Sequence, residues 1–271
     1  MDEFLKRLEK LLINYDCDSR ELKSELDDLI LGSAKRVRPR LARLLVLANG
    51  ETLSETQENF IAAGELLHTA SLIHDDVIDD ADKRRGKISF HKRYDSKLAV
   101  IAGDLLAASA MNKIIKIGNL EIIKLFQTTF EKMCNAEVCQ YYERGKVPSL
   151  EIYLEKTKNK TALLFAEILE GVALLSRSIE KKKARELGLA FGMVFQIRND
   201  LFSFNSESSN DKKNEVYTAP DIFMSQGCEK SLAIEKTELL IDNEKKFALS
   251  ILGAFPDSVY KDELRLMIED L

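Results

Sequence analysis

The chain has 271 residues, 45% of them hydrophobic and 31% charged, with a net charge of -5. Four Pro and twelve Gly are few breakers for this length and favour long helices joined by short turns. The acidic balance argues against a nucleic-acid partner, and apolar runs such as Leu41–Ala48 are too short to span a membrane. Because the start at Met1 lacks the cationic region of a signal peptide and the four Cys suit reduced thiols, we expect a cytoplasmic protein.

Two amphipathic helices and a basic turn are expected first. Residues 2–13 carry apolar side chains at helical spacing, and a second periodic segment ends at Leu31-Gly32. The turn that follows, around Pro39, suits the first turn of the next helix. It carries the cations Lys35, Arg36, Arg38 and Arg40. Cations at a helix N-terminus oppose the helix dipole, and an anionic ligand bound there would resolve this conflict.

The segment Leu66–Gly86 organises the chain, because an apolar run ends there in an acidic cluster followed at once by Lys83, Arg84 and Arg85. The acidic residues are Asp75, Asp76, Asp79, Asp80 and Asp82. In a helix Asp75 and Asp79 lie on one face, where like charges repel. Mg²⁺ would relieve this repulsion, since it accepts one or two carboxylates and completes its shell with phosphate oxygens. A solvated acidic helix end is the alternative, and the mostly apolar stretch upstream argues against it.

The sequence IHDDVIDDADKRRG resembles the first aspartate-rich motif, DDxxD followed by RRG, of the trans-isoprenyl diphosphate synthases. The resemblance implies that Asp75, Asp76 and Asp79 hold Mg²⁺ against an allylic diphosphate. It further implies that Arg84 contacts this diphosphate and that Arg85 contacts isopentenyl diphosphate.

Other segments match the same family in order. GSAKRVRPRL resembles its GGKxxRP motif, so Lys35 and Arg38 would bind isopentenyl diphosphate, with Ser33-Ala34 replacing the usual glycines. His68 stands where the family uses a His against isopentenyl diphosphate. His74 and His91 are expected to serve packing or hydrogen bonding.

Three later segments continue the match. Residues 93–110 resemble the family's AGD helix, and AEVCQ within the expected helix 119–142 resembles GE-x-x-Q. Lys160-Thr161 matches the family's contact with the allylic diphosphate and opens an apolar helix. With Gln196, Thr161 would line the allylic site.

The second metal motif departs from the family. AFGMVFQIRNDLFSFNSE resembles FQxxDDxxD, but Asn199, Asp200 and Ser203 stand at the metal-facing places. In one interpretation the chain is a prenyltransferase whose second site binds metal through neutral oxygens. In the other, Asn199, Ser203 and Glu207 form a stripe similar to the NDxxSxxxE triad of class I terpene cyclases.

The isopentenyl site discriminates between these interpretations, because a cyclase uses one diphosphate substrate and does not need it. Its presence favours the transferase. A non-catalytic regulatory subunit is a third possibility, although such a subunit should have decayed first motifs. After Glu207, Lys213 is a candidate for the family's second diphosphate-binding Lys, and residues 221–271 are helical in pattern without a chemical motif.

The fold predicted from composition and resemblance is a single all-α domain over residues 1–271. It is a bundle of ten or more helices around a central cavity, with the two acidic motifs facing each other at its mouth, and the family fold implies a homodimer. The activity implied is Mg²⁺-assisted ionisation of an allylic diphosphate, with farnesyl diphosphate as the expected starter. Isopentenyl diphosphate then attacks the cation to lengthen a linear polyprenyl diphosphate.

Side chains that precede the first acidic motif on its helix should meet the growing product in turn. They are Ser71, Ala70, Leu67 and Gly64, and Phe126 or Phe130 would close the tunnel. A helical pitch of about 5.4 Å is close to one isoprene unit, so small residues at the first level predict a product of roughly six to eight units. The alternative is that these residues are small only to let a neighbouring helix pack closely.

Overall fold

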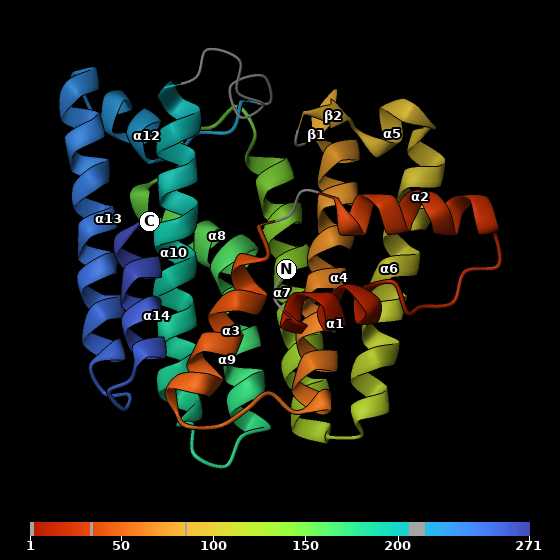
Figure 1. Ribbon diagram of the computed structural model, residues 1–271. Helices are drawn as coiled ribbons and strands as arrows, with labels where there is room; N and C mark the ends of the chain where they lie inside the picture. Colours follow the sequence, from red (N-terminus) through yellow and green to blue (C-terminus); the bar gives the residue numbers. More distant parts are fainter. Residues whose placement is uncertain (1–2, 33–34, 85, 206–214) are drawn as a thin grey trace. The chain divides into compact units, whose positions relative to one another are not determined.

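The computed structural model describes residues 3–32, 35–84, 86–205 and 215–271. In these ranges every regular element is a helix except for one two-stranded hairpin, which confirms the predicted all-α class (Figure 1). The chain divides into two compact units, and α3 (Val37–Ala48) and α7 (Leu120–Glu143) have residues in both. Unit 1 comprises Met1–Ala42 and Leu53–Gln127, and unit 2 comprises Arg43–Thr52 and Thr128–Leu271. The predicted single domain with a central cavity stays a prediction.

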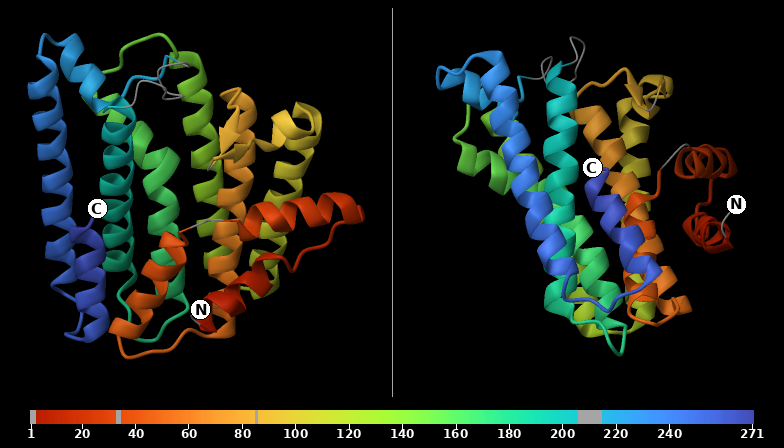
Figure 2. Two further views of the ribbon diagram at one scale, coloured as in Figure 1. Left: turned by 45° about the horizontal axis from the view of Figure 1, so that its top comes forward. Right: turned by 60° about the vertical axis from the view of Figure 1, so that its left-hand side comes forward.

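Unit 1 is organised around one long helix, α4 (Glu55–Ile78), which begins with a capping box between Ser54 and Gln57. Its other elements are α1 (Glu3–Leu12), α2 (Arg20–Leu31), β1 (Lys83–Arg84), β2 (Lys87–Ile88), α5 (Phe90–Arg93) and α6 (Ser96–Ile117). α6 packs along α4 (Figures 1 and 2). The two helices approach closely at Gly103, where an added Cβ would lie 2.2 Å from His74 Nε2.

The length and hydropathy of α6 would also suit a membrane span. In the structure, 39% of its most apolar 18-residue stretch is buried. Core helices of soluble proteins pass the same test. Small residues line its contact with α4, including Ala99, Ala102 and Ala110, all fully buried. The buried small residues agree with the helix packed with small side chains that the sequence predicted for residues 93–110, although α6 begins at Ser96.

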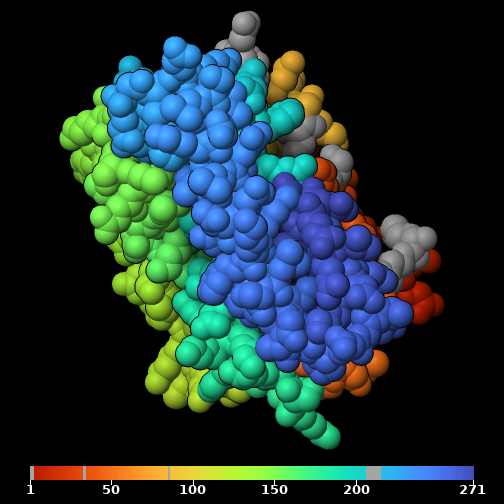
Figure 3. All heavy atoms as spheres, turned by 90° about the vertical axis from the view of Figure 1, so that its left-hand side faces the viewer, coloured from red at the N-terminus to blue at the C-terminus, as the bar shows by residue number. Residues whose placement is uncertain are grey.

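Unit 2 is centred on two apolar helices, α9 (Leu163–Leu174) and α10 (Lys181–Asn205), which pack along each other. Its remaining elements are α8 (Leu150–Thr157), the π-turn η1 (Lys158–Ala162), α12 (Ala219–Ser225), α13 (Lys230–Leu252) and α14 (Val259–Glu269). α13 packs on α10, and α12, α13 and α14 together cover one face of the unit (Figure 3).

The predicted helices are confirmed, including the end of α2, with one refinement at η1. α2 ends at Leu31, and the Gly32 N–H bonds to the Asp28 carbonyl. The expected helix over residues 153–176 is interrupted by η1, whose wider turn is not visible in a 3.6-residue pattern. The hairpin at residues 83–88 was not predicted, because its strands have two residues each.

Candidate functional site

The first acidic segment lies at the C-terminal end of α4. Asp75 is in the last turn of the helix and Asp79 is its C-cap, and the Asp79 N–H bonds to the Asp75 carbonyl at 2.8 Å. Both side chains are half-buried. The two carboxylates are therefore one helical turn apart, as the sequence predicted, in an arrangement suited to a divalent cation that also binds phosphate.

Asp76 has a different environment from its neighbours. It is 3% exposed, and its Oδ1 accepts hydrogen bonds from both Nε (2.8 Å) and Nη2 of Arg84. Arg84 comes from β1 of the hairpin, which pairs Lys83 with Ile88 and Arg84 with Lys87. In this conformation Asp76 holds Arg84 at the end of α4, so it positions a cation that the sequence assigned to the diphosphate.

The distal acids of the segment are bound by α5. Lys92 Nζ lies 2.7 Å from Asp80 Oδ1 and 3.6 Å from Asp82 Oδ1, and the side-chain hydrogen bond to Asp80 raises the pKa of Lys92. Buried His91 meets the Ser89 hydroxyl at 3.2 Å, and His74 Nε2 lies 3.2 Å from the Val100 carbonyl. Both histidines therefore serve packing and hydrogen bonding, as predicted.

The basic segment divides its cations between surface and interior. Lys35 is exposed, whereas Arg38, in the first turn of α3, is 8% exposed. Arg36 turns inward with φ at +49° and lies 3.2 Å from Glu65 Oε2, while its Nη2 also donates to the Ile30 carbonyl. Glu65 lies on α4, one turn from half-buried His68. The Arg36–Glu65 ion pair therefore fixes the basic segment to the helix that carries Asp75 and Asp79.

In unit 2 the Lys160-Thr161 pair lies within the π-turn η1. Lys160 Nζ is 2.5 Å from Glu137 Oε2 on α7, within the AEVCQ segment. Gly192 of α10 permits this turn to pack, because an added Cβ would lie 2.5 Å from the Ala162 Cα. π-turns of this kind often occur at functional sites.

A continuous hydrogen-bond chain joins η1 to the second motif. The Thr161 hydroxyl donates to Gln196 Oε1 at 3.1 Å, and Gln196 Nε2 donates to Asp200 Oδ1 at 2.6 Å. The Tyr153 hydroxyl donates to Asp200 Oδ2, also at 2.6 Å. Thr161 and Gln196, both predicted to line the allylic site, are thus hydrogen-bonded to each other, and Asp200 accepts from Gln196 with Oδ1 and from Tyr153 with Oδ2.

Tyr153 is a member of this hydrogen-bond chain that sequence reasoning missed. It is 1% exposed and belongs to α8, while its partner is on α10, far along the chain. No local spacing signals such a contact. The available clue was the tyrosine itself, because a phenol hydroxyl that is buried without a hydrogen-bond partner is costly.

The remaining predicted metal positions on α10 are Asn199, which is exposed, and Ser203, which is half-buried. They lie one turn apart. Arg85, Glu207 and Lys213 lie outside the described residues. Within the described ranges no group of three or more His, Cys, Asp or Glu residues converges into a metal cluster. The Asp75 and Asp79 pair nevertheless fits Mg²⁺, which needs few protein ligands when phosphate and water complete its shell.

The residues predicted to set chain length are mostly buried. Ala70 is 1% exposed, Leu67 is fully buried, Gly64 is buried, and half-buried Ser71 donates its hydroxyl to the His68 carbonyl. On α7, Phe126 is fully buried and Phe130 is half-buried. The tunnel assignment stays a prediction.

Comparisons with known proteins identify the family of the chain. The polyprenyl synthetase family profile matches residues 19–232. A prenyl transferase of Cyanophora paradoxa is 30% identical over 283 residues, covering 91% of this chain and 87% of that protein. Solanesyl-diphosphate synthase 1, mitochondrial, of Oryza sativa subsp. japonica is 31% identical over 82% of this chain, which spans 59% of that protein's length. The chain therefore belongs to the polyprenyl synthetase family, and its predicted class, a transferase, is confirmed.

A solved structure shares the fold. The polyprenyl synthase from Caulobacter crescentus CB15, complexed with calcium and isoprenyl diphosphate, matches with a TM-score of 0.89 at 21% identity. The match covers 98% of this chain and 93% of that one. This likeness supports the all-α isoprenoid synthase fold.

Proposed function

We propose that this protein condenses isopentenyl diphosphate with an allylic diphosphate, farnesyl diphosphate as the expected starter, into a linear trans-polyprenyl diphosphate. The observation that carries the proposal is the pair of carboxylates one turn apart at the end of α4 in a member of this family. Asp75 and Asp79 would hold Mg²⁺, which when bound neutralises the leaving diphosphate. We further propose a cytoplasmic homodimer.

Each group of residues has a distinct task in this proposal. Lys160 and Arg84 stabilise the charge that develops on the diphosphate as the allylic C–O bond breaks. Lys35, Arg38 and His68 orient isopentenyl diphosphate so that its double bond attacks the allylic cation. A new C–C bond forms, and a proton lost to the released diphosphate completes the cycle.

The Asp200 chain supports the allylic side. Because Tyr153 and Gln196 occupy both oxygens of Asp200, we propose that this carboxylate positions Gln196 and Thr161. Each carboxylate oxygen keeps a second lone pair, so Asp200 would still share the metal contacts predicted for the second motif with Asn199 and Ser203. The stripe of Asn199, Ser203 and Glu207 keeps a cyclase-like triad as the second candidate function.

The experiment that separates the two candidates uses purified protein with Mg²⁺, isopentenyl diphosphate and labelled farnesyl diphosphate. Linear diphosphates longer than the starter support the transferase, and hydrocarbons formed without isopentenyl diphosphate support the cyclase. Asp75→Ala should lower kcat on the order of 10²- to 10³-fold, because it removes charge stabilisation at the leaving group. Asp82→Ala, a matched exposed acid, should remain within a few-fold of wild type.

The product length follows from the small residues on α4. We propose a product of roughly six to eight isoprene units, since each helical turn of about 5.4 Å admits one more unit. Ala70→Phe should shorten the product to farnesyl or geranylgeranyl length, as resolved by reversed-phase chromatography. If the wild type stops at farnesyl diphosphate, or Ala70→Phe leaves the length unaltered, Ala70 serves packing instead.

A further inference from the structure

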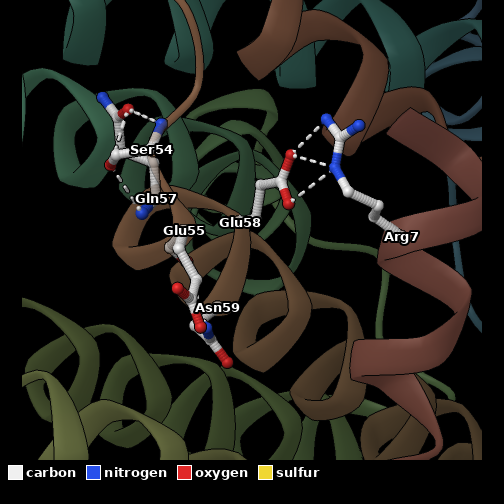
Figure 4. A network of polar contacts seen from close by, with 6 residues as sticks. All are labelled: Arg7, Ser54, Glu55, Gln57, Glu58 and Asn59. Carbon is white, nitrogen blue, oxygen red and sulfur yellow. Dashed lines mark hydrogen bonds and ion pairs between the residues drawn. The ribbon is translucent and has the colours of Figure 1, made fainter. Parts of the chain in front are cut away.

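The two ends of α4 are held in different ways. At its start, a capping box closes the first turn, and Arg7 of α1 binds Glu58, with Nε 3.0 Å and Nη2 2.7 Å from Glu58 Oε1 (Figure 4). Glu58 lies about 26 Å from Asp75 along the helix, at 1.5 Å per residue. Contacts at the start of so long a helix do not hold its last turn, because long helices bend and their ends fray. The turn that carries Asp75 and Asp79 therefore needs contacts of its own.

One edge of this last turn is held by the core and by the hairpin. Ile73 is 2% exposed and Asp76 is 3% exposed. The Asp76 carboxylate also binds Arg84 of β1, with 2.8 Å between Arg84 Nε and Asp76 Oδ1. Ile73 and Asp76 are one turn apart on α4, so these contacts hold the same edge of the helix.

The other edge of the last turn is held by His74 against α6. Its Nε2 lies 3.2 Å from the Val100 carbonyl oxygen, and because a carbonyl can only accept, Nε2 is the donor. The imidazole also fills the space that a side chain at Gly103 would take. An added Cβ there would lie 2.2 Å from His74 Nε2 and 2.5 Å from His74 Cδ2. The absence of a side chain at Gly103 thus forms a seat for the ring in α6.

The nearby carboxylate of Asp104 contributes less to this contact. His74 Nε2 lies 3.4 Å from Asp104 Oδ1, but the Asp104 side chain is 70% exposed, where water screens the pair. The seat at Gly103 and the hydrogen bond to Val100 therefore hold His74 on α6.

Helical geometry places the two carboxylates of the first acidic segment between these edges. Successive residues of an α-helix are rotated by about 100°, so Asp75 projects about 100° from both His74 and Asp76. Asp79, one turn further on, falls in the same arc. Rotation of the last turn in either direction would break the contact at one edge. The contacts of His74 and Asp76 together therefore fix the direction of both carboxylates.

We propose that His74 is a positioning residue for metal binding, which sets the direction of Asp75 and Asp79 by seating the last turn of α4 on α6 at Gly103. The proposal rests on the proposed function, in which these two carboxylates hold Mg²⁺. His74 acts in this role through the backbone of α4, without touching metal or substrate. The direction of the carboxylates matters because Mg²⁺ demands near-ideal octahedral geometry.

The test compares two amides of different reach at position 74. The Gln amide nitrogen can take the place of His74 Nε2 and donate to the Val100 carbonyl, whereas the Asn amide is one methylene shorter. Binding of Mn²⁺, which suits the same oxygen ligands as Mg²⁺, is measured on the intact protein from the electron paramagnetic resonance signal of the free ion. We expect His74→Asn and His74→Ala to raise Kd about tenfold, as when a residue that orients a metal ligand is lost, and His74→Gln to stay within about threefold of wild type.

Gly103→Ala tests the seat itself. The added methyl group displaces the imidazole, so Gly103→Ala should raise Kd as much as His74→Ala does. The two substitutions together should cause no further loss, because both remove the same contact. Asp104→Asn is the matched control on α6 and should leave Kd unchanged, since its side chain is mostly in solvent. The variants at position 74 decide the proposal even if Gly103→Ala does not fold.

Asp75→Ala separates failure of this proposal from failure of the proposed function. If the wild type binds Mn²⁺ no better than Asp75→Ala, the proposed function fails, and the positioning role with it. If Asp75→Ala abolishes binding while His74→Ala and His74→Asn keep the wild-type Kd, only the positioning role is overturned. Equal losses in His74→Gln and His74→Asn would also overturn it, because reach to the Val100 carbonyl would then not matter.

Discussion

The buried carboxylates of the two units have different hydrogen-bond partners. In unit 1 the buried carboxylates of Glu58, Glu65 and Asp76 each meet an arginine. In unit 2, Asp200 accepts hydrogen bonds from Tyr153 and Gln196, and fully buried Glu167 makes no hydrogen bond of good geometry with the residues that the structure describes. An arginine partner offsets the cost of burying a carboxylate, whereas burial raises the pKa of Glu167 well above its usual value.

The difference has a functional meaning. Unit 1 carries the basic and acidic segments proposed to bind diphosphates, and its arginine pairs fix α1, the basic segment and the hairpin to α4. In the proposed function, unit 2 would offer the allylic side a hydrogen-bond network in which Asp200 orients Gln196 and Thr161. A carboxylate within a metal motif can therefore serve as a support as well as a ligand.

Breaking an arginine pair in unit 1 should have the largest effect. Arg36→Met leaves Glu65 buried without its cation and should destabilise the protein by about 3–5 kcal/mol. Urea unfolding measures this change. Arg40→Met, an exposed arginine of the same segment, should change stability by less than about 0.5 kcal/mol.

A double-mutant cycle sharpens this result. Adding Glu65→Gln to Arg36→Met removes the stranded charge and should recover part of the lost stability. Strict additivity of the two substitutions would show that the Arg36–Glu65 pair contributes nothing to the folded state.

Removing a neutral donor in unit 2 should have an intermediate effect. Tyr153→Phe deletes the 2.6 Å hydrogen bond to Asp200 and should cost about 1.5–3 kcal/mol of stability. Because Asp200 positions Gln196 and Thr161, KM for the allylic substrate should rise while KM for isopentenyl diphosphate stays unchanged. Tyr260→Phe, a half-buried tyrosine on α14, is the control. Equal shifts in both KM values would contradict a positioning role.

Replacing the unpaired acid should have the smallest effect and the opposite sign. Burial raises the pKa of Glu167 well above the usual 4.5, and the Thr129 hydroxyl and Arg185 offset this only in part. Above pH 4.5 the unfolded chain releases this proton while the folded chain keeps it, so wild-type stability falls as pH rises towards the folded pKa. Glu167→Gln should therefore be more stable by about 1–3 kcal/mol at pH 7.

The pH dependence of this stability difference shows whether ionisation of Glu167 causes it. Urea unfolding from pH 4 to pH 8 should show the advantage of Glu167→Gln growing with pH, from near zero at the acid end. Glu235→Gln, at an exposed position on α13, should show no such trend. An advantage that is constant across this range would mean that packing, not ionisation, distinguishes the variant.

Much of this architecture could be predicted from sequence because its signals are local. Helix periodicity, the stop at Gly32 and the one-turn spacing of Asp75 and Asp79 depend on neighbouring residues. The inward turn of Arg36 could not be predicted, because it needs a positive φ that no local residue requires. The Tyr153 to Asp200 bond depends on how α8 and α10 pack, which a linear pattern does not contain.

The assignment of Arg84 shows the same limit. Its position after the acidic cluster indicated a cation near diphosphate, but its hydrogen bonds to Asp76 depend on the hairpin, whose two-residue strands have no periodicity to read. The family resemblance identified which residues matter. The structure identifies which of them hold the others in place.

The close approach of Gly192 to Ala162 has a mechanical consequence. The backbone of α10 at Gly192 lies directly against the backbone of the π-turn at Ala162. Close packing of this kind leaves no room for α10 and the π-turn to slide past each other. We therefore expect Lys160, Thr161, Gln196 and Asp200 to move together. In the proposed function, an opening that admits a diphosphate could not occur by sliding at this contact.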